Sequence, residues 1–240
     1  MNPSETRQDS SGRYVLKASS FSSHSLILSD LPRTTRGEAV LDVGAGEGYL
    51  SAILAHRGYR VVCIVEPGTA SPLLPQEVRI VEADLDITRP DLQGVFDFVV
   101  CGDILEHLRD PSATLRWLRV CTKPGGVLIA SLPNGVHLYV RIHVLLGMFP
   151  RHDRGLFDRT HLHFFSWSGW RRLLCESGFE VVASRVTAIP FSLFLSGPFV
   201  RRGAWMLEAA SYLLARAWRG MFAYQFVVSA RPSQAPAPGE

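Results

Sequence analysis

Short apolar runs alternate with amphipathic stretches along most of the chain. Four stretches have the apolar spacing of helices, at residues 20–30, 47–57, 111–122 and 167–177. Seven runs rich in β-branched and aromatic residues predict strands, at residues 38–43, 60–65, 78–81, 96–101, 126–131, 180–186 and 224–230. The first five runs are almost continuously apolar, which is typical of strands that are covered on both faces. This alternation predicts an α/β fold built on a mostly parallel sheet.

Two segments interrupt the alternation. Residues 134–165 contain five histidines and follow the fifth predicted strand, so we expect an insertion that forms a lid over one side of a site. Residues 190–222 predict a helical insertion before the last strand. Its polar side chains share one side of a helical wheel and the rest is apolar. Such a wide apolar face favours packing on the core or against a second copy, and contact with a membrane surface is the alternative.

Length and composition fit one globular domain of 240 residues, which we place at residues 14–230. Residues 1–13 are polar and residues 231–240 are rich in proline, so both ends are expected to be disordered. The net charge of +3 gives no support for a nucleic-acid partner. The first twenty residues lack an apolar signal segment, and no run of about 20 apolar residues occurs, which predicts a cytoplasmic protein.

The cysteine spacing argues against a structural metal site. The four cysteines are 38, 20 and 54 residues apart, without a C-x-x-C pair, so zinc-knuckle spacing is absent and no metal is predicted. Cys63, Cys101 and Cys175 lie in or beside apolar runs. We therefore expect buried, reduced thiols at these positions.

The strongest local signal is a glycine loop between the first predicted strand and the following helix. Gly44, Gly46 and Gly48 would let a ligand approach the backbone closely, and the helix amino end offers unpaired N–H groups. Glu66 follows 22 residues after Gly44, at the end of the second strand, where an acid can bind both hydroxyls of an adenosine ribose. The pattern predicts a nucleotide-like ligand.

Two details separate the candidate nucleotides. A dinucleotide fingerprint requires G-x-G-x-x-G, whereas this loop reads G-x-G-x-G and has Tyr49 where the last glycine should be. Asp42 precedes the loop by two residues, and a carboxylate there is unfavourable for a pyrophosphate but favourable for an ammonium group. A ligand with both an ammonium and a ribose is expected, and S-adenosylmethionine has both.

With these motifs the chain resembles the class I S-adenosylmethionine-dependent methyltransferases, in the group similar to ubiquinone-biosynthesis enzymes. The matching motifs are L-D-V-G-A-G-E-G-Y-L-S, the acid after the second strand, E-A-D-L after the third, and residues 96–108 with their L-E-H sequence. The resemblance implies a Rossmann-like, seven-stranded, mostly parallel sheet with an antiparallel last strand and helices on both faces. It implies a cofactor site formed by Asp42, Gly44, Ala45, Gly46, Gly48, Glu66, Asp84, Leu85 and Cys101.

The catalytic residues are expected beyond the carboxyl ends of strands four and five. A hydroxyl acceptor must lose its proton, and a histidine suits that task. His161 is the favoured base, with Asp158 three residues earlier placed to orient its ring. A structural role for His161 in the lid, or a base at His107 or His163, remains open.

The predicted function is transfer of a methyl group from S-adenosylmethionine to a hydroxyl of a small-molecule, sugar or lipid-linked acceptor. Methylation at nitrogen or carbon and a non-catalytic methyltransferase-like binding module are the alternatives. A short-chain dehydrogenase would need a Tyr-x-x-x-Lys pair, and Tyr14 and Lys17 are one residue too close. The intact glycine loop and ribose acid argue against a degenerate module.

Overall fold

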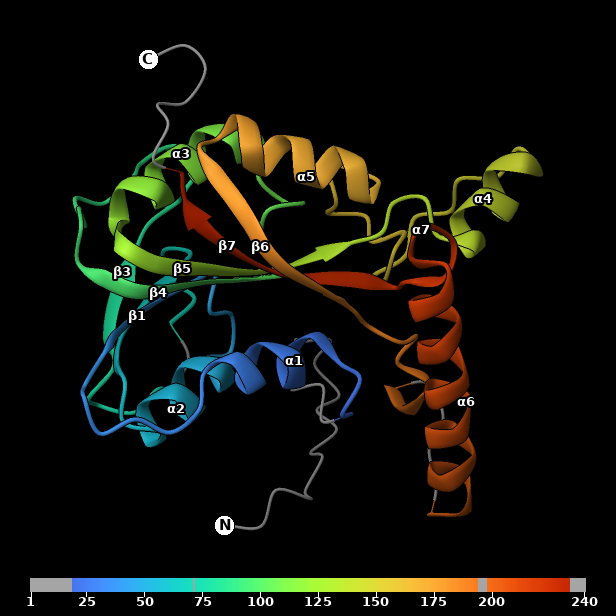
Figure 1. Cartoon of the computed structure of the whole chain (residues 1–240), viewed down its shortest axis with the longest axis horizontal. Helices are drawn as coiled ribbons and strands as arrows, with labels where there is room; N and C mark the ends of the chain where they lie inside the picture. Colours follow the sequence, from blue (N-terminus) through green and yellow to red (C-terminus); the bar gives the residue numbers. More distant parts are fainter. Residues whose placement is uncertain (1–18, 71, 194–197, 234–240) are drawn as a thin grey trace.

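The described residues, 19–70, 72–193 and 198–233 of a computed structural model, form one seven-stranded sheet in the order β3-β2-β1-β4-β5-β7-β6 (Figure 1). Strand β7 runs antiparallel to both of its neighbours, and the other pairs are parallel. The predicted α/β fold class is confirmed. The strands are β1 (Ala39–Val43), β2 (Arg60–Val65), β3 (Arg79–Glu82), β4 (Phe96–Gly102), β5 (Thr122–Pro133), β6 (Phe179–Val186) and β7 (Gln225–Pro232).

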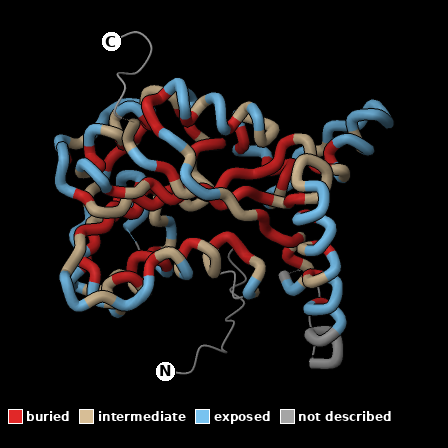
Figure 2. Tube along the Cα trace, viewed as in Figure 1, coloured by how far each residue is buried: buried red, intermediate tan, exposed pale blue. Residues whose placement is uncertain are grey.

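Helices cover both faces of the sheet. Helices α1 (Ser23–Asp30) and α2 (Tyr49–His56) lie on one face, and α3 (Pro111–Cys121) and α5 (Trp167–Glu176) lie on the other (Figure 1). Each pair encloses one apolar layer, so the buried segments follow the sheet (Figure 2). The remaining helical segments are α4 (Leu138–Leu145), the 3₁₀ turn η1 (Phe191–Leu193), α6 (Pro198–Ala217) and α7 (Arg219–Phe222).

Helix starts are fixed by local side-chain chemistry. The Asp110 carboxylate accepts a hydrogen bond from the Ala113 amide at 2.8 Å, and Pro111 follows as the first helical residue of α3. The Ser166 hydroxyl accepts from the Gly169 amide at 3.3 Å at the start of α5. These caps explain why both helices begin close to their predicted positions.

The sheet departs from the sequence prediction at its edge. Strand β3 is an edge strand, and its Ile80 is 40% exposed, so it is not covered on both faces as expected. Strand β7 continues through Arg231 and Pro232, which pair with the start of β6, so the ordered part extends beyond the predicted boundary at 230. The predicted disordered segment 1–13 lies outside the described residues.

The cysteine prediction was partly wrong. Cys63 and Cys101 are buried as expected, but Cys175 is exposed although its sequence neighbours are apolar. Cys175 lies on α5 one residue beyond Leu174, which is buried, so the helical turn directs it outwards. Cys121, at the end of α3, is buried instead.

The helical insertion does not place its wide apolar face on the core, which was one of the two expected arrangements. Between residues 203 and 217 of α6, the buried residues are Ala204, Glu208, Ser211 and Ala215, whereas Trp205, Met206, Leu207, Leu213 and Leu214 are exposed (Figure 2). The Glu208 carboxylate is 2% exposed and accepts hydrogen bonds from the Ser19 hydroxyl and, at 2.8 Å, from the Ser192 amide. Packing of the wide apolar face on the core is therefore wrong. Within the described chain, no helix has both the length and the hydropathy that a membrane span requires.

The strand order reverses between β1 and β4, and this places the site. Strand β1 is followed along the chain by its neighbour on one side, β2, while β4 lies on its other side. The connections that leave the carboxyl ends of β1 and β4 therefore diverge to opposite faces. A crevice at such a point is where open α/β sheets bind ligands.

Candidate active site

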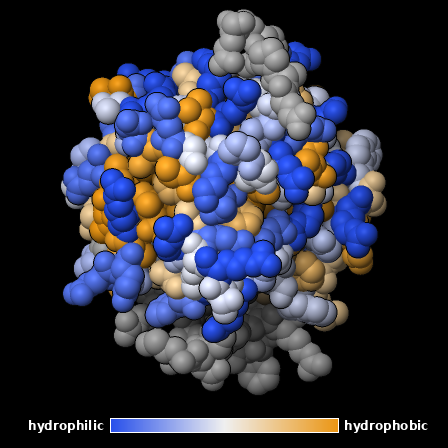
Figure 3. Space-filling view, turned by 60° about the vertical axis from the view of Figure 1, so that its left-hand side comes forward, coloured by the Kyte–Doolittle hydropathy of each residue, from blue (hydrophilic) through white to orange (hydrophobic). Residues whose placement is uncertain are grey.

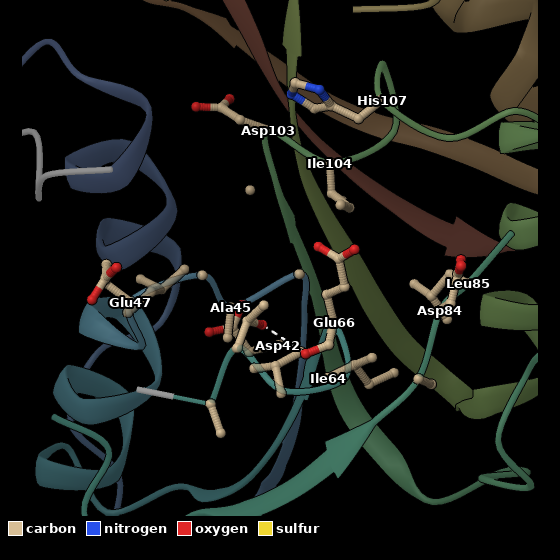
Figure 4. A pocket seen from close by; sticks show the side chains of 18 of the residues that line it. Asp42, Ala45, Glu47, Ile64, Glu66, Asp84, Leu85, Asp103, Ile104 and His107 are labelled. Carbon is tan, nitrogen blue, oxygen red and sulfur yellow. Dashed lines mark hydrogen bonds between the residues drawn. The ribbon is translucent and has the colours of Figure 1, made fainter. Parts of the chain in front are cut away.

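A cavity of about 800 Å³ opens at the carboxyl ends of β1, β2 and β4. Figure 4 shows Asp42 and the glycine loop on one side and Asp84 with Leu85 on the opposite side. Glu66 lies between them with its carboxylate directed into the space, and Asp103 and His107 close the far end (Figure 4). Elongated ligands with chemically distinct ends fit such a cavity.

The glycine loop has a left-handed backbone at three positions, with φ of +71° at Gly44, +51° at Gly46 and +76° at Gly48. A Cβ at Gly44 would lie 2.8 Å from Ile104, so close packing requires glycine there. A Cβ at Gly46 would meet no protein atom within 4 Å, because this residue borders the cavity. The Gly44 and Ala45 amides both donate to the Ile64 carbonyl at 3.0 Å, which ties the loop to β2.

Asp42 is a buried carboxylate at the base of the cavity. It is 2% exposed, and the Ser51 hydroxyl donates to its Oδ2 at 2.7 Å. Burial raises the pKa of Asp42 to about 6, and the Ser51 hydrogen bonds offset only part of that effect. A cation that enters the cavity would favour the ionised form of this carboxylate.

The predicted cofactor residues largely gather here. Glu66, Asp84 and Leu85 line the cavity together with the loop residues Gly44, Ala45 and Gly46. Two of the predicted residues are not among the described lining residues. Gly48 is the amino-terminal cap of α2, and Cys101 is fully buried in the core, where burial raises the pKa of its thiol. Gly102, the next residue after Cys101, borders the cavity instead.

The far end of the cavity presents His107, which is held through a short hydrogen-bond chain. Its Nδ1 lies 3.2 Å from the Thr160 carbonyl and 3.0 Å from the Thr160 hydroxyl. That hydroxyl in turn donates to the Asp158 carboxylate at 2.6 Å. Because a carbonyl and a hydroxyl that already donates can only accept, Nδ1 of His107 must carry the proton. In the neutral ring, Nε2 then has the basic lone pair.

His161 lies in a different environment from the one expected. It is 7% exposed and is not among the described residues that line the cavity. Burial, together with the nearby His107 ring, lowers the pKa of His161 to about 4. Its ring centroid lies 4.8 Å from that of His107, and its Nε2 is 3.8 Å from the Glu106 carboxylate. The Asp158 carboxylate accepts hydrogen bonds from the Thr160 amide and hydroxyl, and its charge also acts on the His161 ring, so the expected orienting role of Asp158 stays a prediction.

Three side chains around this corner have potential metal-ligand atoms. One atom each from Glu106, His107 and His161 lies within 4.8 Å of the other two. Carboxylate and imidazole groups together suit a divalent transition metal. The prediction of no metal rested on cysteine spacing, which does not bear on this cluster. The proposed methyl transfer does not require an ion at these three residues.

Sequence reasoning missed Asp103, Thr160 and Glu106. Asp103 lines the cavity and is the single non-glycine residue of the described chain with a left-handed backbone, at φ +54°. The hydroxyl of Ser131 and, at 2.8 Å, the amide of Gln225 both donate to its carboxylate. A strained residue held by two other strands is typical of a functional position. The acid after the fourth strand was a visible signal, but its partners come from β5 and β7.

Comparisons with known proteins identify the family of this chain. A family model described as a methyltransferase domain matches residues 21–184. A ubiquinone biosynthesis O-methyltransferase from Pseudomonas aeruginosa is 32% identical over 161 residues, which cover 60% of this chain and 66% of that protein. The chain thus spans just under two thirds of the length of this relative.

Solved structures share the fold. An S-adenosylmethionine-dependent methyltransferase from Mesorhizobium loti matches 88% of this chain and 98% of its own, with a TM-score of 0.61 at 16% identity. A 1,6-didemethyltoxoflavin-N1-methyltransferase from Burkholderia thailandensis, solved with S-adenosylhomocysteine, matches 88% of this chain and 77% of its own, with a TM-score of 0.53 at 19% identity. The family match decides the assignment: the chain belongs to the class I S-adenosylmethionine-dependent methyltransferases, in the group similar to the ubiquinone-biosynthesis enzymes.

Proposed function

We propose that this protein transfers a methyl group from S-adenosylmethionine to a hydroxyl oxygen of a small-molecule, sugar or lipid-linked acceptor. The observation that carries the proposal is that the glycine loop, Glu66 and His107 line the same cavity. The cofactor supplies a methyl group already activated on a sulfonium, so the protein has to hold the acceptor in line and accept one proton. The O-methyltransferase relative supports oxygen as the acceptor atom.

The cofactor residues follow from the chemistry along the cavity. Asp42 would pair with the ammonium, since a buried carboxylate with a raised pKa gains most from a cation. Glu66 would accept hydrogen bonds from both ribose hydroxyls, and Asp84 with the Leu85 amide would bind the adenine ring. The open space at Gly46 would take the part of the cofactor nearest the loop.

His107 takes the place of His161 as the proposed base. It borders the cavity, and its protonated Nδ1 leaves Nε2 able to accept the acceptor proton as the new oxygen–carbon bond forms. Thr160 and Asp158 would hold this tautomer and stabilise the ring once it is charged. His161, with its lowered pKa, packs behind the base in the neutral form.

The test uses the methyl-labelled cofactor with three sets of soluble probes: phenols and catechols, sugars, and primary amines. We expect label in a hydroxyl-bearing probe as a methyl ether that resists mild alkali. Isothermal titration with S-adenosylhomocysteine runs in parallel. Label in amines alone would replace the oxygen assignment with nitrogen. Tight binding of S-adenosylhomocysteine without transfer to any probe or to a cell extract would favour a binding module.

A further inference from the structure

An exposed apolar face on α6 has a regular pattern. The large side chains Met206, Leu207, Leu213 and Leu214 are 49–65% exposed, and Trp218 just beyond the helix is 59% exposed. Met206 and Leu213 are seven residues apart, as are Leu207 and Leu214, so both pairs stay on one side of the helix. Gly203, Ala210 and Ala217 repeat at the same interval between them.

The opposite side of α6 is already used by the rest of the chain. Ala204, Glu208, Ser211 and Ala215 face inwards, and the Ser211 hydroxyl accepts from the Ile189 amide at 3.1 Å. The Tyr212 ring stacks at a tilt on Phe21, with centroids 4.9 Å apart. Figure 1 shows α6 at the edge of the molecule beyond β6, so its outer face is not covered by the described chain.

We propose that α6 forms an antiparallel helix pair with α6 of a second copy of this chain, which makes the protein a dimer. A heptad repeat fits another helix of the same repeat, and the small residues between the large ones let two helix axes approach closely. In a two-fold antiparallel pair, Ala210 lies near the axis and opposite its own copy. Gly203 would then face Ala217 of the partner subunit.

The exposed area is close to what a dimer needs. Large apolar side chains present on the order of 150–250 Å² each when fully exposed. At the exposed fractions of these five residues, each chain would contribute roughly 600 Å², against about 800 Å² per partner in a standard interface. The small residues and the flanks of the helices add to that area.

Charge argues for a second copy over a lipid surface. A helix that lies on a membrane usually directs a cationic face to the headgroups. Among residues 203–217, the part of α6 whose side chains the structure describes, Glu208 and Ser211 are buried and Arg216 is the exposed charge. Figure 3 turns the left-hand side of Figure 1 forward. On that face of the molecule, hydrophilic side chains lie between the hydrophobic ones.

The experiment compares oligomeric state by sedimentation equilibrium. The wild-type chain should have twice its mass of 26.6 kDa. Leu213→Asp should give a monomer with an unchanged circular-dichroism spectrum. Leu145→Asp, which alters a leucine of α4 that is 86% exposed, should stay dimeric. A monomeric wild-type protein overturns the proposal.

A cross-link keeps the proposal testable if Leu213→Asp fails to fold. Ala210→Cys in a Cys175→Ser background should oxidise to a covalent dimer, while Ala209→Cys, one position round the helix, should not. Equal or absent cross-linking at both positions refutes the antiparallel pair. Binding of a monomer to vesicles of anionic phospholipid, lost in Leu213→Asp, would assign the face to a membrane instead.

Discussion

At the level of single residues, the glycine loop allows steric strain to be separated from ligand contact. Gly46 and Gly94 both have a left-handed backbone, at φ +51° and +61°, and neither would bring a Cβ within 4 Å of a protein atom. Gly46 lines the cavity and Gly94 does not. A Cβ should therefore cost similar backbone strain at both positions, on the order of 1–2 kcal/mol. Any effect on ligand affinity should belong to Gly46 alone.

We expect Gly46→Ala to weaken binding of S-adenosylhomocysteine by at least tenfold, because its new methyl group occupies space the ligand needs. Gly46→Ala and Gly94→Ala should lower the midpoint of thermal unfolding by similar amounts. Gly94→Ala should leave the affinity for S-adenosylhomocysteine within about twofold of wild type. Isothermal titration and calorimetry on both variants measure the two quantities. Equal affinities in the two variants would contradict the placement of the ligand at this loop.

Glu66 provides a second contrast between residues. Two charge-assisted hydrogen bonds to a ribose contribute on the order of 1.5–3 kcal/mol each. Glu66→Ala should then raise the dissociation constant for S-adenosylhomocysteine by roughly two to four powers of ten. Glu77→Ala removes an exposed carboxylate that does not line the cavity, and this variant should change the affinity little. A loss below about threefold at Glu66 would place the ribose elsewhere.

At the level of elements, backbone hydrogen bonds attach the predicted lid, residues 134–165 between β5 and α5, to the rest of the protein. The amides of Leu162 and His163 both donate to the Glu106 carbonyl, at 2.8 and 3.3 Å, so the lid is bound to the turn that carries His107. The Gly135 amide donates to the Phe165 carbonyl at 2.9 Å and closes the base of the lid. These contacts place Thr160 against His107.

Two variants at Thr160 test whether its hydroxyl takes part in catalysis. Thr160→Val has the same shape but loses the hydroxyl that links His107 to Asp158, so we expect kcat to fall about tenfold or more. Thr160→Ser retains the hydroxyl and should keep most of the rate. The KM for the acceptor and the affinity for S-adenosylhomocysteine should move little in either variant. Equal kcat values for the two variants would show that the hydroxyl has no part in catalysis.

Sequence periodicity predicted the elements well because the central strands β1, β4 and β5 and strand β7 are largely buried apolar runs, and because α3 and α5 begin at side-chain caps. The glycine loop and Glu66 were found for the same reason, since their signals are contiguous in the chain. The His107 arrangement was not, because Thr160 and Asp158 reach it from more than fifty residues away. The orientation of α6 was also missed, because burial of Glu208 depends on donors at Ser19 and Ser192 that no helical wheel contains.

At the level of the whole molecule, Asp42 couples stability to pH. Its pKa rises from 3.8 in the unfolded chain to about 6 in the fold. The folded state therefore binds the Asp42 proton more tightly than the unfolded chain does. The stability gained from this proton is present below about pH 4 and is lost as the pH rises through 6. A shift of this size corresponds to on the order of 2–3 kcal/mol. Asp42→Asn should be more stable than wild type at pH 7.5 and similar at pH 4, as measured by denaturant unfolding without ligand.

The same carboxylate should make cofactor binding depend on pH. If the ammonium of S-adenosylhomocysteine pairs with ionised Asp42, binding releases a proton below pH 6, and the affinity should rise between pH 5 and 7. 5′-Methylthioadenosine has the same nucleoside but no ammonium, so its affinity should stay nearly flat over that range. In Asp42→Asn both ligands should show the flat profile, because the titrating group is gone. Titrations of both ligands at pH 5, 6 and 7 measure this, and parallel pH profiles for the two ligands in the wild-type protein would remove Asp42 from the ammonium site.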